Sequence, residues 1–194
     1  MVVMATYALP RGQGGAFTVE DLDALPEDGN RYELVDGVLL VSAAPVPRHQ
    51  WVQRELMLRL DAGAGRDWVV LAAPTDVRVG VHTSLEPDLV VIARAAVPHL
   101  AGFVPVPTLC VEVLSPSTRK VDVGTKSLAL AAIGVPSYWL VDPAVPSILV
   151  RRLVGDGYLD DRLAVGEELL EVQVPYPVAL RPADLVRELP AWAE

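Results

Sequence analysis

Two acidic side chains stand where the sequence predicts buried β-strands. Glu112 lies in the middle of the apolar run 109–114, where an isolated carboxylate is costly to bury. Asp88 opens a second apolar run, residues 89–92. If these strands are neighbours, the two carboxylates converge on one side of the sheet, where they repel each other unless a divalent cation lies between them. Mg²⁺ prefers one or two carboxylates and several waters, so the pair indicates a magnesium site.

The same pair of acids predicts how a substitution affects stability. Without a metal ion, Asp88 and Glu112 would face each other partly desolvated, and both effects disfavour the doubly ionised pair. We therefore expect Asp88→Asn to leave the metal-free protein as stable as the unmodified protein, or more stable by about 1 kcal/mol.

Three further polar residues can be interpreted in two ways. Glu33 lies between Tyr32 and Leu34, and an alternating, half-buried strand would leave it in water. His49 opens a predicted helix, where a surface or capping role is commoner than metal ligation. Lys126 follows the Glu112 strand on another predicted helix, where it is either a solvated lysine or a cation that returns to the acids.

Short-range signals predict the elements that position these residues. Asp36-Gly37 between two apolar runs predicts a β-hairpin that joins residues 31–35 to 38–42. Apolar residues at helical spacing predict a helix over 48–62 that stops at Gly63. Strands are expected at 68–72, 76–80 and 87–92.

A strand, a helix and a second strand follow one another across residues 108–142, which is the pattern of a βαβ unit. The helix is expected from about Asp122 to Ile133, with Gly134 as a left-handed C-cap. Residues 148–153 and 169–180 alternate less cleanly and are predicted to be edge strands. The chain is therefore assigned to the α/β class.

Length and composition fit one compact domain. The chain has 194 residues, so we expect a flexible N-terminal lead-in over 1–15 and a single domain over 16–194. Hydrophobic residues make up 52% of the chain, which excludes a disordered protein. No apolar stretch is long enough to span a membrane, and the N-terminus lacks the pattern of a secretory signal. With Cys110 as its single cysteine, the chain is predicted to be cytoplasmic.

The overall charge of the chain limits how it could bind nucleic acid. A net charge of −9 argues against nonspecific coating of nucleic acid, which requires broad Lys/Arg patches. It leaves open a nucleic-acid enzyme whose binding groove is neutralised locally by metal ions.

Several motifs occur together in the order typical of a known family. The segments RYELVDG, EPDLVV, VEVLSPST and SYWLVDP, with Asp122 and Lys126 before the last of them, resemble the bacterial Uma-two family of putative restriction endonucleases. That family belongs to the PD-(D/E)xK nuclease superfamily, and the resemblance covers about residues 17–155. It implies a restriction-endonuclease-like α/β core, with a central mixed β-sheet flanked by helices.

The resemblance also implies roles for individual residues. Asp88, Glu112 and the backbone carbonyl of Val113 would hold Mg²⁺ or Mn²⁺. Glu33 would hold a water or a second ion, which reverses the expectation that it is exposed. Lys126 would orient the attacking water and offset charge on the scissile phosphate. Phosphodiester hydrolysis is thus the implied reaction, and its implied catalytic residues are Glu33, Asp88, Glu112 and Lys126.

The sequence departs from the superfamily pattern just after the central acid. Leu114 stands where the superfamily places a lysine two residues after the acid, whereas Lys126 matches the lysine that the Uma-two pattern carries on the following helix. Leu130 stands where the family often has tyrosine, so a group that could stack or donate a hydrogen bond is missing there.

The implied partner is nucleic acid, with DNA favoured over RNA, and no membrane association is expected. A homodimer is expected because symmetric dimers are the commonest assembly and duplex DNA has two strands to cut. The alternative is a catalytically inactive nuclease-fold module for binding or assembly, with a structural metal site. The acidic charge and Leu114 favour this alternative, whereas the four retained polar residues favour the nuclease.

Overall fold

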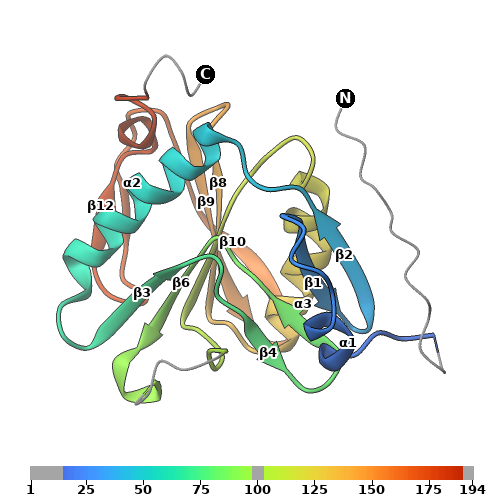
Figure 1. Ribbon diagram of the computed structural model, residues 1–194. Helices are drawn as coiled ribbons and strands as arrows, with labels where there is room; N and C mark the ends of the chain where they lie inside the picture. Colours follow the sequence, from blue (N-terminus) through green and yellow to red (C-terminus); the bar gives the residue numbers. More distant parts are fainter. Residues whose placement is uncertain (1–14, 98–102, 190–194) are drawn as a thin grey trace.

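A computed structural model describes residues 15–97 and 103–189 of the chain. The described residues form one sheet of six strands, one of four and one of two. Figure 1 shows how these sheets and the helices are arranged. Apart from its last residue, the lead-in predicted over 1–15 lies outside the described residues. Within the two described ranges, no helix is both long and apolar enough to cross a membrane.

The six-stranded sheet forms the centre of the molecule. Its strands are, in spatial order, β10 (Gly157–Val165), β9 (Ser147–Val154), β8 (Ser137–Asp142), β7 (Leu109–Val113), β6 (Leu89–Ala93) and β3 (Trp68–Ala72). β7 and β8 are parallel, and the other neighbouring pairs are antiparallel. The βαβ unit predicted across residues 108–142 and the mixed central sheet are thus confirmed.

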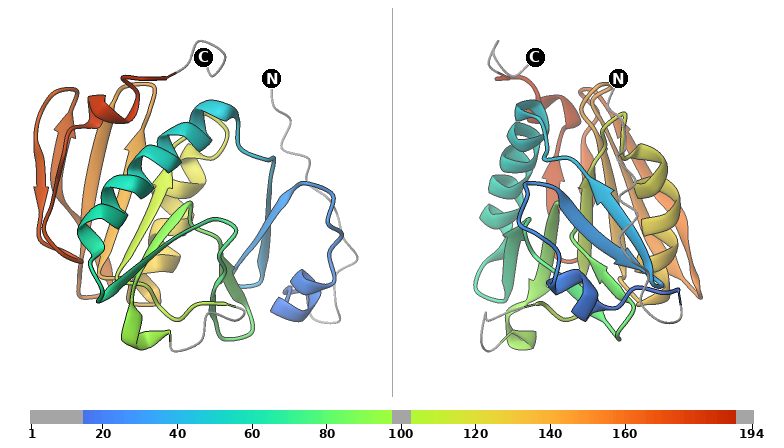
Figure 2. Two further views of the ribbon diagram at one scale, coloured as in Figure 1. Left: turned by 60° about the vertical axis from the view of Figure 1, so that its left-hand side comes forward. Right: turned by 45° about the vertical axis from the view of Figure 1, so that its right-hand side comes forward.

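Helices cover both faces of this sheet (Figure 2). On one face, Leu56 and Leu60 of helix α2 (Pro47–Ala64) pack in an apolar cluster with β3, β6 and β7. On the other face, Leu130 of helix α3 (Ser127–Ala132) packs with Val90 and Cys110 of the sheet. All of β7 is therefore buried, as the apolar run around Glu112 predicts.

The four-stranded sheet begins with the predicted hairpin. Its strands are, in spatial order, β2 (Val38–Ser42), β1 (Arg31–Val35), β5 (Thr83–Leu85) and β4 (Val77–Val79). β1 and β2 pair over the predicted residues, from Arg31 opposite Ser42 to Val35 opposite Val38. Asp36 and Gly37 both have positive φ, 47° and 77°, which is the backbone that a two-residue hairpin turn requires.

The expected helices differ from the structure at their ends. α2 begins at Pro47 and continues through the predicted stop, Gly63, to Ala64, and Gly65 with φ of 59° follows it. The helix predicted from Asp122 is a π-helical turn, Val121–Lys126, followed by the α-helical segment α3. The remaining short helices are α1 (Val19–Asp23) and the 3₁₀ turns Arg94–Ala96 and Pro182–Leu185.

The expected edge strands were only partly right. β9 was predicted as an edge strand but lies inside the sheet, because β10, which the sequence analysis did not predict, pairs with its outer side. The region predicted at 169–180 forms a separate pair, β11 (Leu170–Val172) and β12 (Val178–Leu180), which packs in the apolar cluster around α2.

Candidate active site

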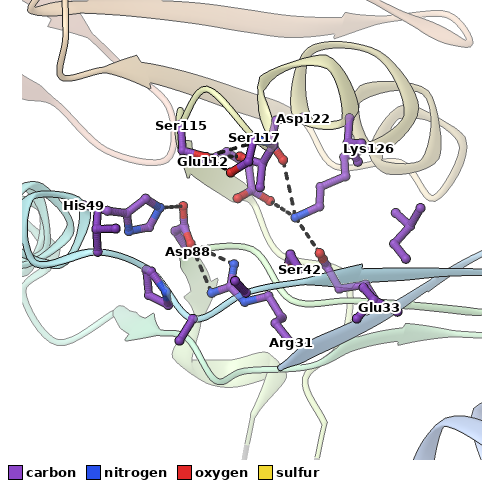
Figure 3. A pocket seen from close by; sticks show the side chains of 18 residues that line it. Arg31, Glu33, Ser42, His49, Asp88, Glu112, Ser115, Ser117, Asp122 and Lys126 are labelled. Carbon is purple, nitrogen blue, oxygen red and sulfur yellow. Dashed lines mark hydrogen bonds and ion pairs between the residues drawn. The ribbon is translucent and has the colours of Figure 1, made fainter. Parts of the chain in front are cut away.

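A cavity of about 170 Å³ lies between the four-stranded sheet and β7 (Figure 3). β1, β2 and the link into α2 form one wall, and the residues that follow β7 form another. The structure brings all the predicted catalytic side chains to this cavity: Glu33, Asp88, Glu112 and Lys126. Three further charged or titratable residues line it, namely Arg31, His49 and Asp122.

Lys126 is buried among carboxylates. Its Nζ atom lies 2.8 Å from Glu33 Oε2 and 2.9 Å from Glu112 Oε1, with Asp122 Oδ1 at 3.6 Å. Only 4% of the residue is exposed, so the interpretation of Lys126 as a solvated helix lysine is wrong. Lys126, in the helical connection between β7 and β8, thus returns to Glu112, as the family pattern implies.

The π-helical turn presents Asp122 and Lys126 to the cavity together. Turns of this kind are rare and occur frequently at functional sites. Side chains bind two of its backbone carbonyls: Tyr138 Oη donates to the carbonyl of Asp122 at 2.9 Å, and Arg151 Nη1 donates to that of Val123 at 3.0 Å. These bonds fix the turn against β8 and β9.

Asp88 lies just before β6 and is surrounded by hydrogen-bond donors. Its Oδ2 atom accepts from the Val113 N–H at 2.8 Å and lies 2.9 Å from His49 Nε2. Its Oδ1 atom accepts from Nη1 and Nη2 of Arg31, both at 3.1 Å. The neighbouring strand β7 therefore meets Asp88 through the N–H of Val113, while the role of the Val113 carbonyl as a ligand stays a prediction.

Helix α2 contacts Asp88 through two residues that the sequence analysis did not assign to the site. His49 was expected at the surface or in a capping role, but it is buried and contacts the Asp88 carboxylate. Gln53, one turn later, donates from Nε2 to the Asp88 carbonyl at 2.7 Å. Their spacing of i and i+4 places them on one helix face, a signal that could have paired them in the sequence.

Glu33 is buried, contrary to the expectation from strand alternation alone. Its Oε1 atom accepts from the Glu86 N–H at 2.8 Å, and its other oxygen contacts Lys126. Alternation correctly separates the two faces of β1, but the face that carries Glu33 is turned toward the cavity instead of toward bulk water. Arg31 lies two residues earlier in the same strand and shares this face.

The two acids of the predicted metal pair have opposite electrostatic surroundings. Burial would raise the pKa of Asp88, but the hydrogen bond and charge of His49, the charge of Arg31 and the Val113 N–H lower it to about 2. Burial raises the pKa of Glu112 well above its ordinary value, and the charge of Lys126 offsets this only in part because three other acids are near. At Lys126, burial alone would lower the pKa of the ammonium, but the charges of Glu112, Glu33 and Asp122 outweigh burial and raise it.

The positions that depart from the family pattern are filled by apolar packing. Leu114 and Leu130 are both buried in the apolar cluster on the α3 face of the sheet. Neither brings a polar group to the cavity, so Lys126 is the lysine that meets Glu112.

The residue types at the cavity fit a divalent cation. Four carboxylates line it (Glu33, Asp88, Glu112 and Asp122), together with two permanent cations, Arg31 and Lys126. When every carboxylate is ionised, four negative charges against two positive charges leave an excess of two, and oxygen ligands suit Mg²⁺. As the side chains stand, no three His, Cys, Asp or Glu groups within 15–97 and 103–189 lie close enough to hold an ion. Binding of an ion therefore requires side-chain movement that brings these acids closer together.

Comparisons with known proteins identify the fold and the family of the chain. A crystal structure of a putative nuclease belonging to DUF820 from Anabaena variabilis superposes with a TM-score of 0.68 at 22% identity. The match covers 88% of this chain and 98% of that one, which confirms the expected α/β fold. No curated protein matches the chain. The family model for Uma2, described as putative restriction endonuclease, matches residues 19–183, and the chain therefore belongs to this family.

Proposed function

We propose that the protein is a metal-dependent nuclease that hydrolyses phosphodiester bonds of nucleic acid, with DNA as the expected substrate. One observation carries the proposal: the ammonium of Lys126 meets Glu33 and Glu112 in the same cavity that Asp88 lines. Carboxylates that can hold a metal ion, beside a cation that can offset charge on a phosphate, are what phosphoryl chemistry requires. The description of the family supports the same reaction class.

Asp88, Glu112 and the carbonyl of Val113 are the proposed ligands of Mg²⁺ or Mn²⁺. A bound ion would lower the pKa of a coordinated water and offset charge on the phosphate oxygens. Asp88, with a pKa of about 2, stays ionised at neutral pH, and the ionised form is the one that binds a metal ion. Glu112 has a raised pKa, so it would release any proton it carries when the ion binds.

Lys126 and Glu33 are the proposed catalytic groups beside the ion. Nζ of Lys126 makes two short contacts to carboxylates, and Asp122 at 3.6 Å is beyond hydrogen-bond range. An ammonium has three N–H donors, so Lys126 keeps one for the attacking water or a phosphate oxygen. Glu33 is held at both oxygens, by Lys126 and by the Glu86 N–H, and these contacts fix its side chain at the cavity wall.

A catalytically inactive module for binding or assembly is the second candidate. The observation that favours it is that Arg31 and Lys126 already neutralise part of the acid cluster, so that the fold does not depend on a catalytic ion. The net charge of −9 also disfavours broad contact with nucleic acid.

Incubation of the purified protein with single-stranded and duplex DNA and RNA separates the two candidates. We expect cleavage with Mg²⁺ or Mn²⁺, no cleavage in excess chelator, and loss of cleavage in Asp88→Ala and Glu112→Ala. Arg187→Ala, whose exposed guanidinium pairs with Glu167 outside the cavity, is a control that should cleave normally. Cleavage that survives both acid substitutions would refute the assignment, and binding without cleavage would favour the module.

We further propose that the protein acts as a homodimer in the cytoplasm. Two symmetric copies would present two cavities to the two strands of a duplex. The buried free thiol of Cys110 fits a reducing compartment. Sedimentation velocity with and without duplex DNA tests the assembly, and a monomer at all concentrations would contradict it.

A further inference from the structure

Arg31 is a charged residue of the cavity to which the sequence motifs assign no role. Its Nη1 and Nη2 atoms both lie 3.1 Å from Asp88 Oδ1, and its Nε atom lies 2.6 Å from a carboxylate oxygen of Glu86. The side chain is 16% exposed, compared with 1% for Asp88. Arg31 is therefore more accessible to solvent than the Asp88 carboxylate that it contacts.

The Asp88 carboxylate has no acceptor capacity left. An ionised carboxylate offers about four lone-pair sites, and four N–H groups contact this one. They come from the Val113 backbone, from His49 Nε2 and from the two Nη atoms of Arg31. A metal ion that uses Asp88 as a ligand must therefore displace one of these donors.

Of the donors on Asp88, Arg31 is the one free to move. The Val113 N–H is part of strand β7, and His49 is buried at the start of α2. Arg31 has a long, partly exposed side chain, and its contact with Glu86 can be kept when the Nη atoms leave Asp88. Both Nη atoms also hold the same oxygen, Oδ1, so a single movement releases it.

We propose that Arg31 is an internal counter-cation that occupies the metal position on Asp88 until a divalent ion displaces it. It neutralises Asp88 in the metal-free protein, and after displacement its Nη groups face the cavity, where a substrate phosphate can bind them. The inference rests on the proposed function in placing the ion at Asp88. It goes further because it makes Arg31 a competitor of the metal and a contact of the substrate.

Metal affinity tests the competition without any need for cleavage. Titration calorimetry with MnCl₂ and MgCl₂ is carried out on the unmodified protein, on Arg31→Gln and on Arg78→Gln. Arg78 is a matched control, since its side chain is 18% exposed and binds Asp23 and Asp76 outside the cavity. We expect Arg31→Gln to lower the Kd for Mn²⁺ by about tenfold or more, equal to about 1.4 kcal/mol, and Arg78→Gln to change it less than twofold.

A second measurement tests whether Arg31 contacts the substrate phosphate. Single-turnover cleavage at saturating metal should fall by about 10²-fold in Arg31→Gln, as for loss of a charge-stabilising donor, and should not change in Arg78→Gln. If Arg31 only positioned Asp88, its loss would weaken metal binding and slow turnover together. Tighter metal binding combined with slower turnover therefore distinguishes a competing arginine from a merely structural one.

A crystal structure of the unmodified protein with Mn²⁺ keeps the inference testable if Arg31→Gln fails to fold. We expect both Nη atoms to lie beyond hydrogen-bond reach of Asp88 Oδ1, which is about 3.5 Å. An Arg31 that still contacts Oδ1 beside a bound ion would overturn the inference, as would an unchanged or higher Kd in Arg31→Gln or the absence of metal binding. If Arg31→Gln binds metal more tightly but the unmodified protein cleaves nothing, the inference stands and the nuclease proposal fails.

Discussion

The buried acids at the two ends of the cavity have different hydrogen-bonding and charge partners. At one end, four N–H donors from three residues surround Asp88 and hold its pKa near 2. At the other end, Glu112 shares one ammonium with Glu33 and Asp122, and burial raises its pKa well above the ordinary value. Environments that push the pKa values of two acids apart commonly mark different chemical roles. We infer that Asp88 is a permanent anion, whereas Glu112 can exchange a proton for a metal ion.

The largest effect is expected from removal of the cation at the Glu112 end. Lys126→Met leaves buried carboxylates without a charge partner, so the metal-free protein should lose about 3–5 kcal/mol of unfolding free energy at pH 7. Urea unfolding measures this loss. In the control, Arg187→Met removes ion pairs of a side chain that is 57% exposed, and it should leave the unfolding free energy nearly unchanged. A loss below about 1 kcal/mol in Lys126→Met would show that the ammonium is not essential to the cluster.

Metal binding should then link the two ends. The unmodified protein should gain about 2.7 kcal/mol in Mg²⁺ or Mn²⁺ at a hundredfold excess over Kd. Asp88→Asn and Glu112→Gln should each lose most of this gain, because both acids are proposed ligands of the same ion. Thermal melts in chelator and across a metal titration measure the effect. If the stabilisation by metal persists in Asp88→Asn, the ion binds at the Glu112 end alone. If it persists in Glu112→Gln, the ion binds at the Asp88 end alone.

Without metal, the Asp88 end should respond strongly to loss of its charge. A pKa lowered from 3.8 to about 2 corresponds to about 2 kcal/mol, so Asp88→Asn should destabilise the protein by about that amount at pH 7. This reverses the expectation from sequence, which overlooked the donors of Arg31 and His49. Because the folded pKa is lowered, the contribution is present above about pH 4 and lost as pH falls through 2. Urea unfolding at pH 7 and pH 3 should show the difference shrinking, and equal stability at pH 7 would restore the sequence-based expectation.

The smallest effect is expected at Glu112. Its folded pKa is raised, so the folded protein holds the proton more tightly than the unfolded chain, and ionisation costs stability as pH rises above 4.5. Glu112→Gln should therefore change stability at pH 7 less than Asp88→Asn does. Between pH 5 and pH 8, the stability of Glu112→Gln should improve relative to that of the unmodified protein in the same urea unfolding assay. A loss as large as that of Asp88→Asn would remove the contrast between the two ends.

Elements with strong local signals could be predicted from the sequence. The hairpin of β1 and β2 follows from Asp36-Gly37, because these residues tolerate positive φ between apolar runs. The parallel pair β7 and β8 follows from a strand, helix and strand pattern across 108–142. Turn chemistry and periodicity depend on residues close together in the chain, so they can be recognised without the fold.

Elements that depend on distant partners could not be predicted. β5 has three residues and exists because it pairs with both β1 and β4. β10 is largely exposed on its outer side and becomes a strand by pairing with β9, which it turns into an interior strand. The backbone carbonyls of the π-helical turn accept hydrogen bonds from the hydroxyl of Tyr138 on β8 and the guanidinium of Arg151 on β9. Both strands follow the turn in the chain.

For the candidate site, the sequence by itself determined which groups are present. Its motifs identified Glu33, Asp88, Glu112 and Lys126, and the fold does bring them to one cavity. Only the tertiary structure decided that His49 and Arg31 hold Asp88, and that Glu112 lacks such donors. The physical reason is that the charge state of a buried acid depends on burial and on donors within a few ångströms, and those donors come from segments far apart in the chain.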